Sequence, residues 1–268
     1  MPTRAYLRSV TNVGVAVGAA GAALALQLDT RGAYWTVLVL DGLTFMCAAT
    51  VMRRLPEVTV TPFAGPTDGQ ALGVLQDRRY VAMSSVNVLL LLHVPLIEVV
   101  LPLWVTLRTQ APKWMVSIIL IVNTLTVVLL QVRMTRNIGS PLAALAALRR
   151  AGLWLCVACA GFALAAAVSR ATAVALLAAA AVFHVLGEML HASASWNLSY
   201  GLAPPGRTAE YQAFFNSGHT VASTLAPAAL VLLLVEGSAL GWLLLGGLFL
   251  LAPQLMRVVV LRQPLTPR

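Results

Sequence analysis

The chain has little charge. Only 10% of its 268 residues are Asp, Glu, Lys or Arg, whereas 59% are apolar, and the mean hydropathy is +0.85. Because a soluble domain carries roughly a quarter of charged residues, this composition predicts one multi-span membrane bundle and not a set of soluble domains. The net charge of +9 does not indicate a nucleic-acid partner, since the arginines lie at the ends of apolar runs and form no basic face.

Cysteine is scarce as well. Cys47, Cys156 and Cys159 all lie within apolar runs, which argues against a disulfide framework and a zinc cluster. The sequence has no phosphate-binding glycine loop, so an ATP-driven mechanism is not indicated. Strands that alternate apolar and polar residues are also absent, and helices satisfy their own backbone groups in a bilayer. We therefore expect an all-α polytopic transmembrane bundle that needs no cofactor and no metal.

Apolar stretches long enough to cross a bilayer recur along the chain. They predict eight spans, at residues 8–28, 34–53, 80–106, 114–132, 152–169, 171–200, 209–235 and 239–261. The spans divide into two in residues 1–55 and six in residues 78–268. Between these groups, residues 56–77 are rich in Pro, Gly and Thr, which is typical of a linker.

The basic residues predict the orientation of these spans. With a cytoplasmic N-terminus, 14 basic residues fall on the inner side and four, Arg31, Arg108, Lys113 and Arg170, on the outer side. The positive-inside rule then predicts a multi-pass plasma-membrane protein with both termini and the linker in the cytoplasm. Aromatic residues near the span ends, including Trp104 and Trp242, predict an interfacial belt.

Three ionisable residues share one face of the span at residues 171–200. His184, Glu188 and His191 are spaced i, i+4 and i+7, so they point the same way. An ionisable group within a bilayer costs about 2.5–3.5 kcal/mol, which makes each a candidate functional residue. Three interpretations remain open: polar contacts between helices with a gating role, a proton relay, and a metal site completed by His93, His219 or Glu98.

Other polar residues within the spans are further candidates for a transport pathway. Glu98 lies between Pro95 and Pro102, and Asn87 is eleven residues earlier and nearly in phase with it, so we expect both to face one polar cavity. Further candidates lie near mid-membrane or, for the last, near an outer span end: Asn123, Asn216, His219 and Asp41. The stripe of Gly14, Gly18 and Gly21 is typical of close helix packing.

Four segments follow one another in an order that resembles one transporter family. They are the glycine-rich segment Arg8–Gly21, then Leu40-Asp41-Gly-Leu-Thr-Phe45 before Arg53-Arg54-Leu-Pro56, then Asp77-Arg78-Arg79-Tyr80 with Val100-Leu-Pro102, and finally Leu186-Gly187-Glu188-Met189 before Leu202-Ala203-Pro204 and Arg207…Tyr211-Gln212. In this order they are similar to the last eight of the twelve helices of a major facilitator superfamily transporter of the bacterial drug-efflux type. Two departures are the missing Gly-Pro pair after the first segment and Thr208, where the family usually has glycine.

The resemblance implies a proton-coupled exporter of small hydrophobic molecules, and not an enzyme. It also implies that four helices are missing, together with the Gly-x-x-x-Asp-Arg-x-Gly-Arg-Arg loop between the family's second and third helices, which nothing in this sequence matches. The segment Arg133–Gly139 is at best a degenerate copy of the equivalent loop in the second half. An alternating-access transporter needs two halves, so we expect the chain not to transport alone. It is then a fragment, a product with a misassigned start at Met1, or a reduced protein. The alternatives are a membrane-embedded metalloenzyme using His184, Glu188 and His191, and a non-transporting remnant or partner subunit completed by a second chain.

Overall fold

The computed structural model describes residues 30–54 and 73–261, with eight further positions between Val10 and Leu28. Within these residues the chain is helical and contains no strand. Seven helical stretches are long and apolar enough to cross a membrane, which confirms the predicted all-α, multi-pass membrane fold. The predicted span at residues 8–28 lies mostly outside the described residues, as does the linker up to residue 72.

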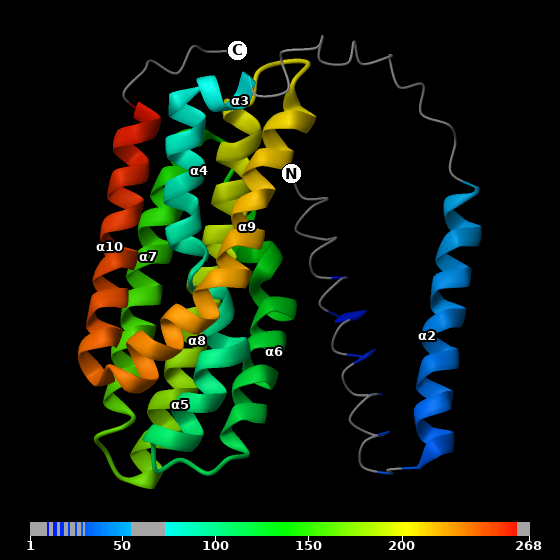
Figure 1. The fold of residues 1–268 in the computed structure, drawn as a ribbon, viewed down its shortest axis with the longest axis vertical. Helices are drawn as coiled ribbons and strands as arrows, with labels where there is room; N and C mark the ends of the chain where they lie inside the picture. The colour runs from blue at the N-terminus through cyan, green and yellow to red at the C-terminus, as the bar shows by residue number, and fades with distance from the viewer. Residues whose placement is uncertain are drawn as a thin grey trace.

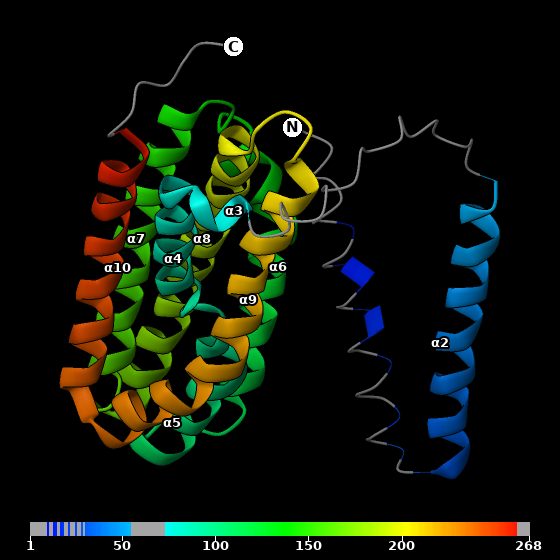
Figure 2. The same ribbon diagram turned by 45° about the horizontal axis from the view of Figure 1, so that its top comes forward.

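The first described span, α2 (Arg31–Met52), stands apart from the remaining six in both ribbon views (Figures 1 and 2). The Thr30 hydroxyl caps the helix by accepting a hydrogen bond from the Ala33 backbone N–H at 3.2 Å. None of its residues is buried. Asp41 is exposed and is the eleventh residue of this helix, which begins three residues earlier than the sequence predicted.

Six spans form the main bundle. They are α4–η1–α5 (Arg78–Leu91, Leu96–Val100, Leu101–Arg108), α6 (Met115–Thr135), α7 (Pro141–Leu164), α8 (Arg170–Leu202), α9–η2 (Thr208–Leu230, Val231–Glu236) and α10 (Ser238–Leu261). α8 packs along α7 and α6, α10 packs along α7 and α4, and α4 also contacts α9. The helices alternate in direction, so α4 and α9 begin at the end where α10 finishes (Figure 1).

We call that end of the bundle the basic end. Eight described basic residues of the six spans lie at it or within three turns of it: Arg78, Arg79, Arg133, Arg136, Arg149, Arg150, Arg207 and Arg257. The opposite end of these spans has three, Arg108, Lys113 and Arg170. The charge asymmetry predicted from the sequence therefore holds for the described residues of these six spans.

Helix α7 begins at Pro141, eleven residues before the predicted span at 152–169. Ser140 caps it by accepting from the Ala143 N–H at 3.2 Å, and Pro141 occupies the first helical position, which needs no N–H donor. The sequence prediction excluded this segment because Arg149 and Arg150 lower its hydropathy. Both arginines are exposed on the helix, where their long side chains can extend toward water.

Small residues let the inner helices approach closely. The faces of α7 and α8 that meet are rich in buried alanine. Gly187 on α8 lies against α7, where an added Cβ would be 2.7 Å from Leu155 Cγ and 3.0 Å from the Ala151 carbonyl oxygen. By contrast, Gly14, Gly18 and Gly21 have no described residue within 4 Å of such a Cβ, so the close packing predicted for them is not seen here.

A buried aromatic cluster lies toward the end of the bundle opposite the basic end. Trp104 and Trp242 lie edge to face with ring centroids 5.4 Å apart, and the Trp104 indole N–H donates to the Phe162 carbonyl oxygen at 2.8 Å. The two tryptophans are 2% and 0% exposed. They are therefore core residues joining α5, α7 and α10, and the prediction that they belong to an interfacial belt was wrong. Trp35 and Trp114, by contrast, are exposed.

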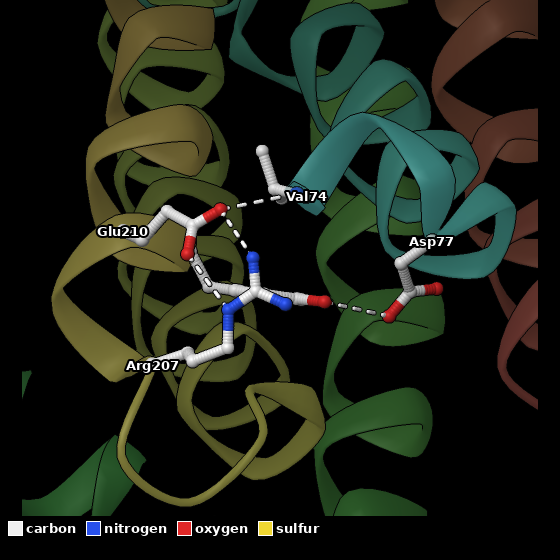
Figure 3. A network of polar contacts seen from close by, with 5 residues as sticks. Val74, Asp77, Arg207 and Glu210 are labelled. Atoms are coloured by element: carbon white, nitrogen blue, oxygen red, sulfur yellow. Dashed lines mark hydrogen bonds and ion pairs between the residues drawn. The ribbon is translucent and has the colours of Figure 1, made fainter. Parts of the chain in front are cut away.

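At the basic end, a carboxylate connects the short helix α3 (Gly73–Gln76) to the start of α9 (Figure 3). Glu210 accepts a hydrogen bond from the Val74 backbone N–H at 3.1 Å and two from the Arg207 guanidinium at 2.8 and 2.9 Å. This hydrogen bonding raises the pKa of Arg207 above its ordinary value. The guanidinium lies directly against the Cα of Gly73, where any side chain would overlap it.

A second carboxylate joins the same elements. Asp77 caps α4 by accepting from the Tyr80 N–H at 3.0 Å, and its other oxygen accepts from the Tyr211 hydroxyl at 3.4 Å. The Tyr80 hydroxyl oxygen lies 3.2 Å from the Ser199 carbonyl oxygen and 3.1 Å from the Tyr211 carbonyl oxygen, so it can donate its hydrogen to either of them. The last residues of the linker, which include Val74 and Asp77, are therefore bound to the start of α9 through Glu210 and Tyr211.

We expect Glu210→Ala to free the start of α3. A hydrogen bond to a charged acceptor contributes about 1.5–3 kcal/mol, so hydrogen exchange at the Val74 amide is expected to accelerate roughly 10-fold or more. Arg207→Ala is the matched control. It removes only a partly exposed ion pair worth about 0.2–1 kcal/mol and is expected to accelerate exchange by less than about 5-fold. Equal effects of the two variants in exchange mass spectrometry would contradict the role of the Val74 hydrogen bond.

Candidate functional site

Three of the four histidines meet in the interior of the bundle. His184 and His191 lie on α8, as their spacing predicted, and His93 lies where α4 ends. All three are buried, with exposed fractions of 3% or less. The His93 ring lies edge to face against both of the others, with centroid separations of 5.5 Å to His184 and 5.0 Å to His191.

A chain of hydrogen bonds runs through two of these rings to an amide. His93 Nε2 and His191 Nδ1 are 3.0 Å apart, and His191 Nε2 is 3.0 Å from Asn87 Oδ1. The amide oxygen can only accept, so His191 Nε2 carries a proton. In the neutral ring His191 Nδ1 is then an acceptor, and His93 Nε2 is the donor to it. With the Asn87 amide oxygen assigned to the side facing His191, this arrangement gives one tautomer for each of the two rings.

The third imidazole has a different task. His184 Nε2 lies 3.0 Å from the His93 carbonyl oxygen, so it donates a hydrogen bond to the backbone of the neighbouring span. That backbone is irregular, because Pro95 has no N–H for the α-helical ladder and a π-helical turn follows at Leu96–Val100. His184 therefore provides a hydrogen-bond donor to a carbonyl group at the helix break. The break places the His93 ring against His191.

Glu188 lies one turn from each of the two histidines on α8 and is half-buried. Asn123 of α6 donates a hydrogen bond from its amide nitrogen to Glu188 Oε2 at 3.3 Å. This contact adds α6 as a third span to the site and orients the carboxylate.

These side chains border a cavity of about 570 Å³ between α4, α8 and α9. Among the described residues that line it, Glu188 is the one carboxylate, and none of them is a lysine or an arginine. The lining is otherwise a mixture of apolar, aromatic, amide and imidazole groups: Asn87, Leu91, His93, Val94, His191, Ala192, Ser195, Trp196, Phe215, Asn216, His219 and Thr220.

Most residues predicted for a transport pathway meet here. Five of them line the cavity: Asn87, Glu188, His191, Asn216 and His219. Asn123 contacts Glu188, and His184 is buried next to His93 without lining the cavity.

Two predicted residues do not join this site. Glu98 is exposed and does not line the cavity, although Asn87 does. The break at Leu92–His93 and the π-helical turn change the helical phase between them, so the eleven-residue spacing does not bring them to one face. Asp41 lies on α2, away from the cavity.

His93 is the site residue that the transport-pathway prediction omitted. The positions three and four residues before and after it are occupied by leucine and isoleucine, and its ring is positioned by contacts with α8. The sequence does contain one indication of its role, which is a proline two residues after it, in His93-Val-Pro95, within an apolar run. A proline two residues later indicates a helix break, and a break exposes backbone and side-chain groups to polar partners.

The cluster is not arranged as a metal site. Among the described residues, no group of three or more His, Cys, Asp or Glu side chains is placed to hold a metal ion. Both nitrogens of His191 make hydrogen bonds, and His184 uses Nε2 on a backbone carbonyl. The geometry therefore gives no support to a metalloenzyme built on His184, Glu188 and His191.

Neither a comparison with models of known protein families nor one with curated proteins gives a match. The resemblance to the major facilitator superfamily therefore remains a hypothesis based on the order of motifs in the sequence. The function has to be argued from the cavity and its wall.

Proposed function

We propose that this chain forms part of a proton-coupled membrane transporter that exports small, largely apolar molecules through the cavity between α4, α8 and α9. The observation that carries the proposal is the cavity wall itself. It combines apolar and aromatic surface, which suits such a substrate, with Glu188 and a buried imidazole pair, which can exchange protons. A cavity of about 570 Å³ is within the size range of sites for small organic ligands.

The orientation belongs to the same proposal. The excess of arginine at the basic end supports a cytoplasmic location for that end, and with it for the linker and the C-terminus, in a plasma membrane. In this orientation the interaction of Glu210 with Val74 and Arg207 is cytoplasmic.

The exposed helix α2 favours additional helices as partners. A carboxylate at the middle of a span is costly in lipid and usually faces a protein interior, yet Asp41 is exposed. We therefore propose that further helices, in a longer form of this chain or in a second chain, pack against α2 and complete the transporter. For this reason the transport assay uses protein tagged at its C-terminus and expressed from its own locus, with its mass measured on the same preparation.

Glu188→Gln is expected to abolish proton-driven efflux, because the neutral amide cannot bind and release a proton. The measurement is export of a fluorescent lipophilic dye from proteoliposomes under an imposed pH gradient, with loss of at least about 10-fold expected. Glu98→Gln is the matched control, since it changes an exposed carboxylate outside the cavity in the same way and is expected to leave efflux unchanged. Undiminished efflux by the Glu188 variant would rule out this role.

A further inference from the structure

The His93–His191 pair contains four ring nitrogens, and the hydrogen bonds assign three of them. His191 Nε2 donates to Asn87 Oδ1, His93 Nε2 donates, and His191 Nδ1 accepts. The remaining basic nitrogen of the neutral pair is His93 Nδ1. The two rings therefore carry two N–H protons when neutral and have one place for a third.

A fourth proton is incompatible with the bond between the rings. If both imidazoles were cationic, His93 Nε2 and His191 Nδ1 would each carry a hydrogen and neither could accept. Two positive charges would also face each other across 3.0 Å in a buried site. As long as the hydrogen bond is kept, the pair binds one proton and no more, and the proton belongs to both rings.

We propose that His93 and His191 together form a single-proton binding site in the wall of the cavity. Proton uptake forms one N–H bond at His93 Nδ1. Movement of the bridging proton breaks the N–H bond at His93 Nε2 and forms one at His191 Nδ1, so the charge passes from one span to the other without another reactant. The role of this site in coupling rests on the proposed function, whereas its proton stoichiometry does not.

In the described part of the chain, three of the helices packed around the pair contribute polar or titratable groups to this site. α8 contributes Glu188 and His184, α9 contributes His219 at the cavity wall, and α6 contributes the uncharged Asn123 through its contact with Glu188. Glu98, in the π-helical turn η1, is exposed and does not line the cavity. Glu188 is thus the anionic group that faces a proton on the pair from within the cavity.

His184 lies outside the proton site, because its ring does not line the cavity that His93 and His191 border. Its Nε2–H is committed to the His93 carbonyl oxygen, and the ring is 1% exposed and does not line the cavity. We therefore expect His184 to stay neutral with the proton on Nε2 while the His93–His191 pair gains and loses one proton. This assignment differs from a relay through His184, Glu188 and His191 along α8, because it runs between α8 and the break after α4.

The chain has four histidines, so ¹⁵N-histidine labelling gives a spectrum simple enough to assign completely. Solid-state NMR of the full chain in lipid, from about pH 5 to 8.5, reads tautomer and charge for each ring. We expect a nitrogen–nitrogen coupling between His93 and His191, one added proton for the two rings together, and an unchanged neutral signal for His184. His219 serves as the internal reference, because it lies exposed at the cavity wall and outside the hydrogen bond between His93 and His191.

His93→Gln and His191→Gln are each expected to remove the coupling and the shared titration, whereas His219→Gln is expected to leave both in place. Because the wild-type spectrum alone counts protons, the test does not depend on a variant that folds. Two separate imidazolium signals for His93 and His191, or protonation of His184, would overturn the proposal. Efflux that survives Glu188→Gln would reject the proposed transport role of Glu188 while leaving the one-proton result intact, so the two failures are distinguishable.

Discussion

Gly152→Val is expected to lower the thermal stability of the protein more than any single exposed substitution. Gly152 of α7 lies directly against the Phe249 carbonyl oxygen of α10, and the position of its missing Cβ is 2.9 Å from Pro253 Cγ. Backbone atoms cannot move aside as a flexible side chain can, so valine must push the two helices apart. Overpacking costs about 1–3 kcal/mol in ordinary cores, and we expect this site to be at the upper limit or above it.

The measurement is the midpoint of heat-induced aggregation in detergent, followed by size-exclusion chromatography. At about 3 kcal/mol, the expected decrease in the midpoint is on the order of 6–12 °C. Gly247→Val on α10 is the matched control, because no described atom lies within 4 Å of a Cβ built there. Equal decreases for the two variants would show that loss of glycine as such, and not contact between α7 and α10, causes the effect.

His184→Leu is expected to destabilise the bundle by about 2 kcal/mol. The substitution removes the donor to the His93 carbonyl oxygen from a fully buried position, and withdrawing a partner from a buried acceptor costs about 1–3 kcal/mol. The helix break at Leu92–His93 would then lose a support, and the His93 ring would lose its fixed position against His191. The same heat-aggregation assay is expected to show a decrease of about 4–8 °C.

His184→Gln is the control for chemistry at this position, because its side-chain amide retains an N–H donor. We expect it to recover part of the stability and to keep the nitrogen–nitrogen coupling between His93 and His191 in the ¹⁵N spectrum. If leucine were tolerated as well as glutamine, the hydrogen bond to the backbone would not matter for stability.

The helical membrane fold could be predicted from the sequence because lipid imposes a simple rule on backbone groups. Runs of about 20 apolar residues must be helices, and six of the seven described spans begin within three residues of their predicted starts. The exception is α7, where Arg149 and Arg150 lower the hydropathy of a segment that is nevertheless helical. A hydropathy window averages over the whole circumference of a helix and cannot see that both arginines lie on an exposed side.

Only part of the candidate site could be predicted from helical spacing. Helical spacing put His184, Glu188 and His191 on one face of α8, which is a regular helix, and two of them, Glu188 and His191, line the cavity. Spacing failed for Glu98 because the irregular turns after Leu91 change the phase of the span. It could not find His93, whose position depends on contacts between helices that no single-helix pattern encodes.

The three spans that border the cavity are also the longest. They contain 29 to 33 residues, whereas α6, α7 and α10 provide spans of 21 to 24. At 1.5 Å per residue the first group is about 44–50 Å long and the second about 32–36 Å, against a hydrocarbon layer of about 30 Å. The shorter helices therefore match the bilayer, while the cavity helices must tilt or project from it. Bilayer thickness therefore affects the two groups differently. We expect a change in lipid chain length to alter the tilt of the helices that border the cavity more than that of the shorter helices.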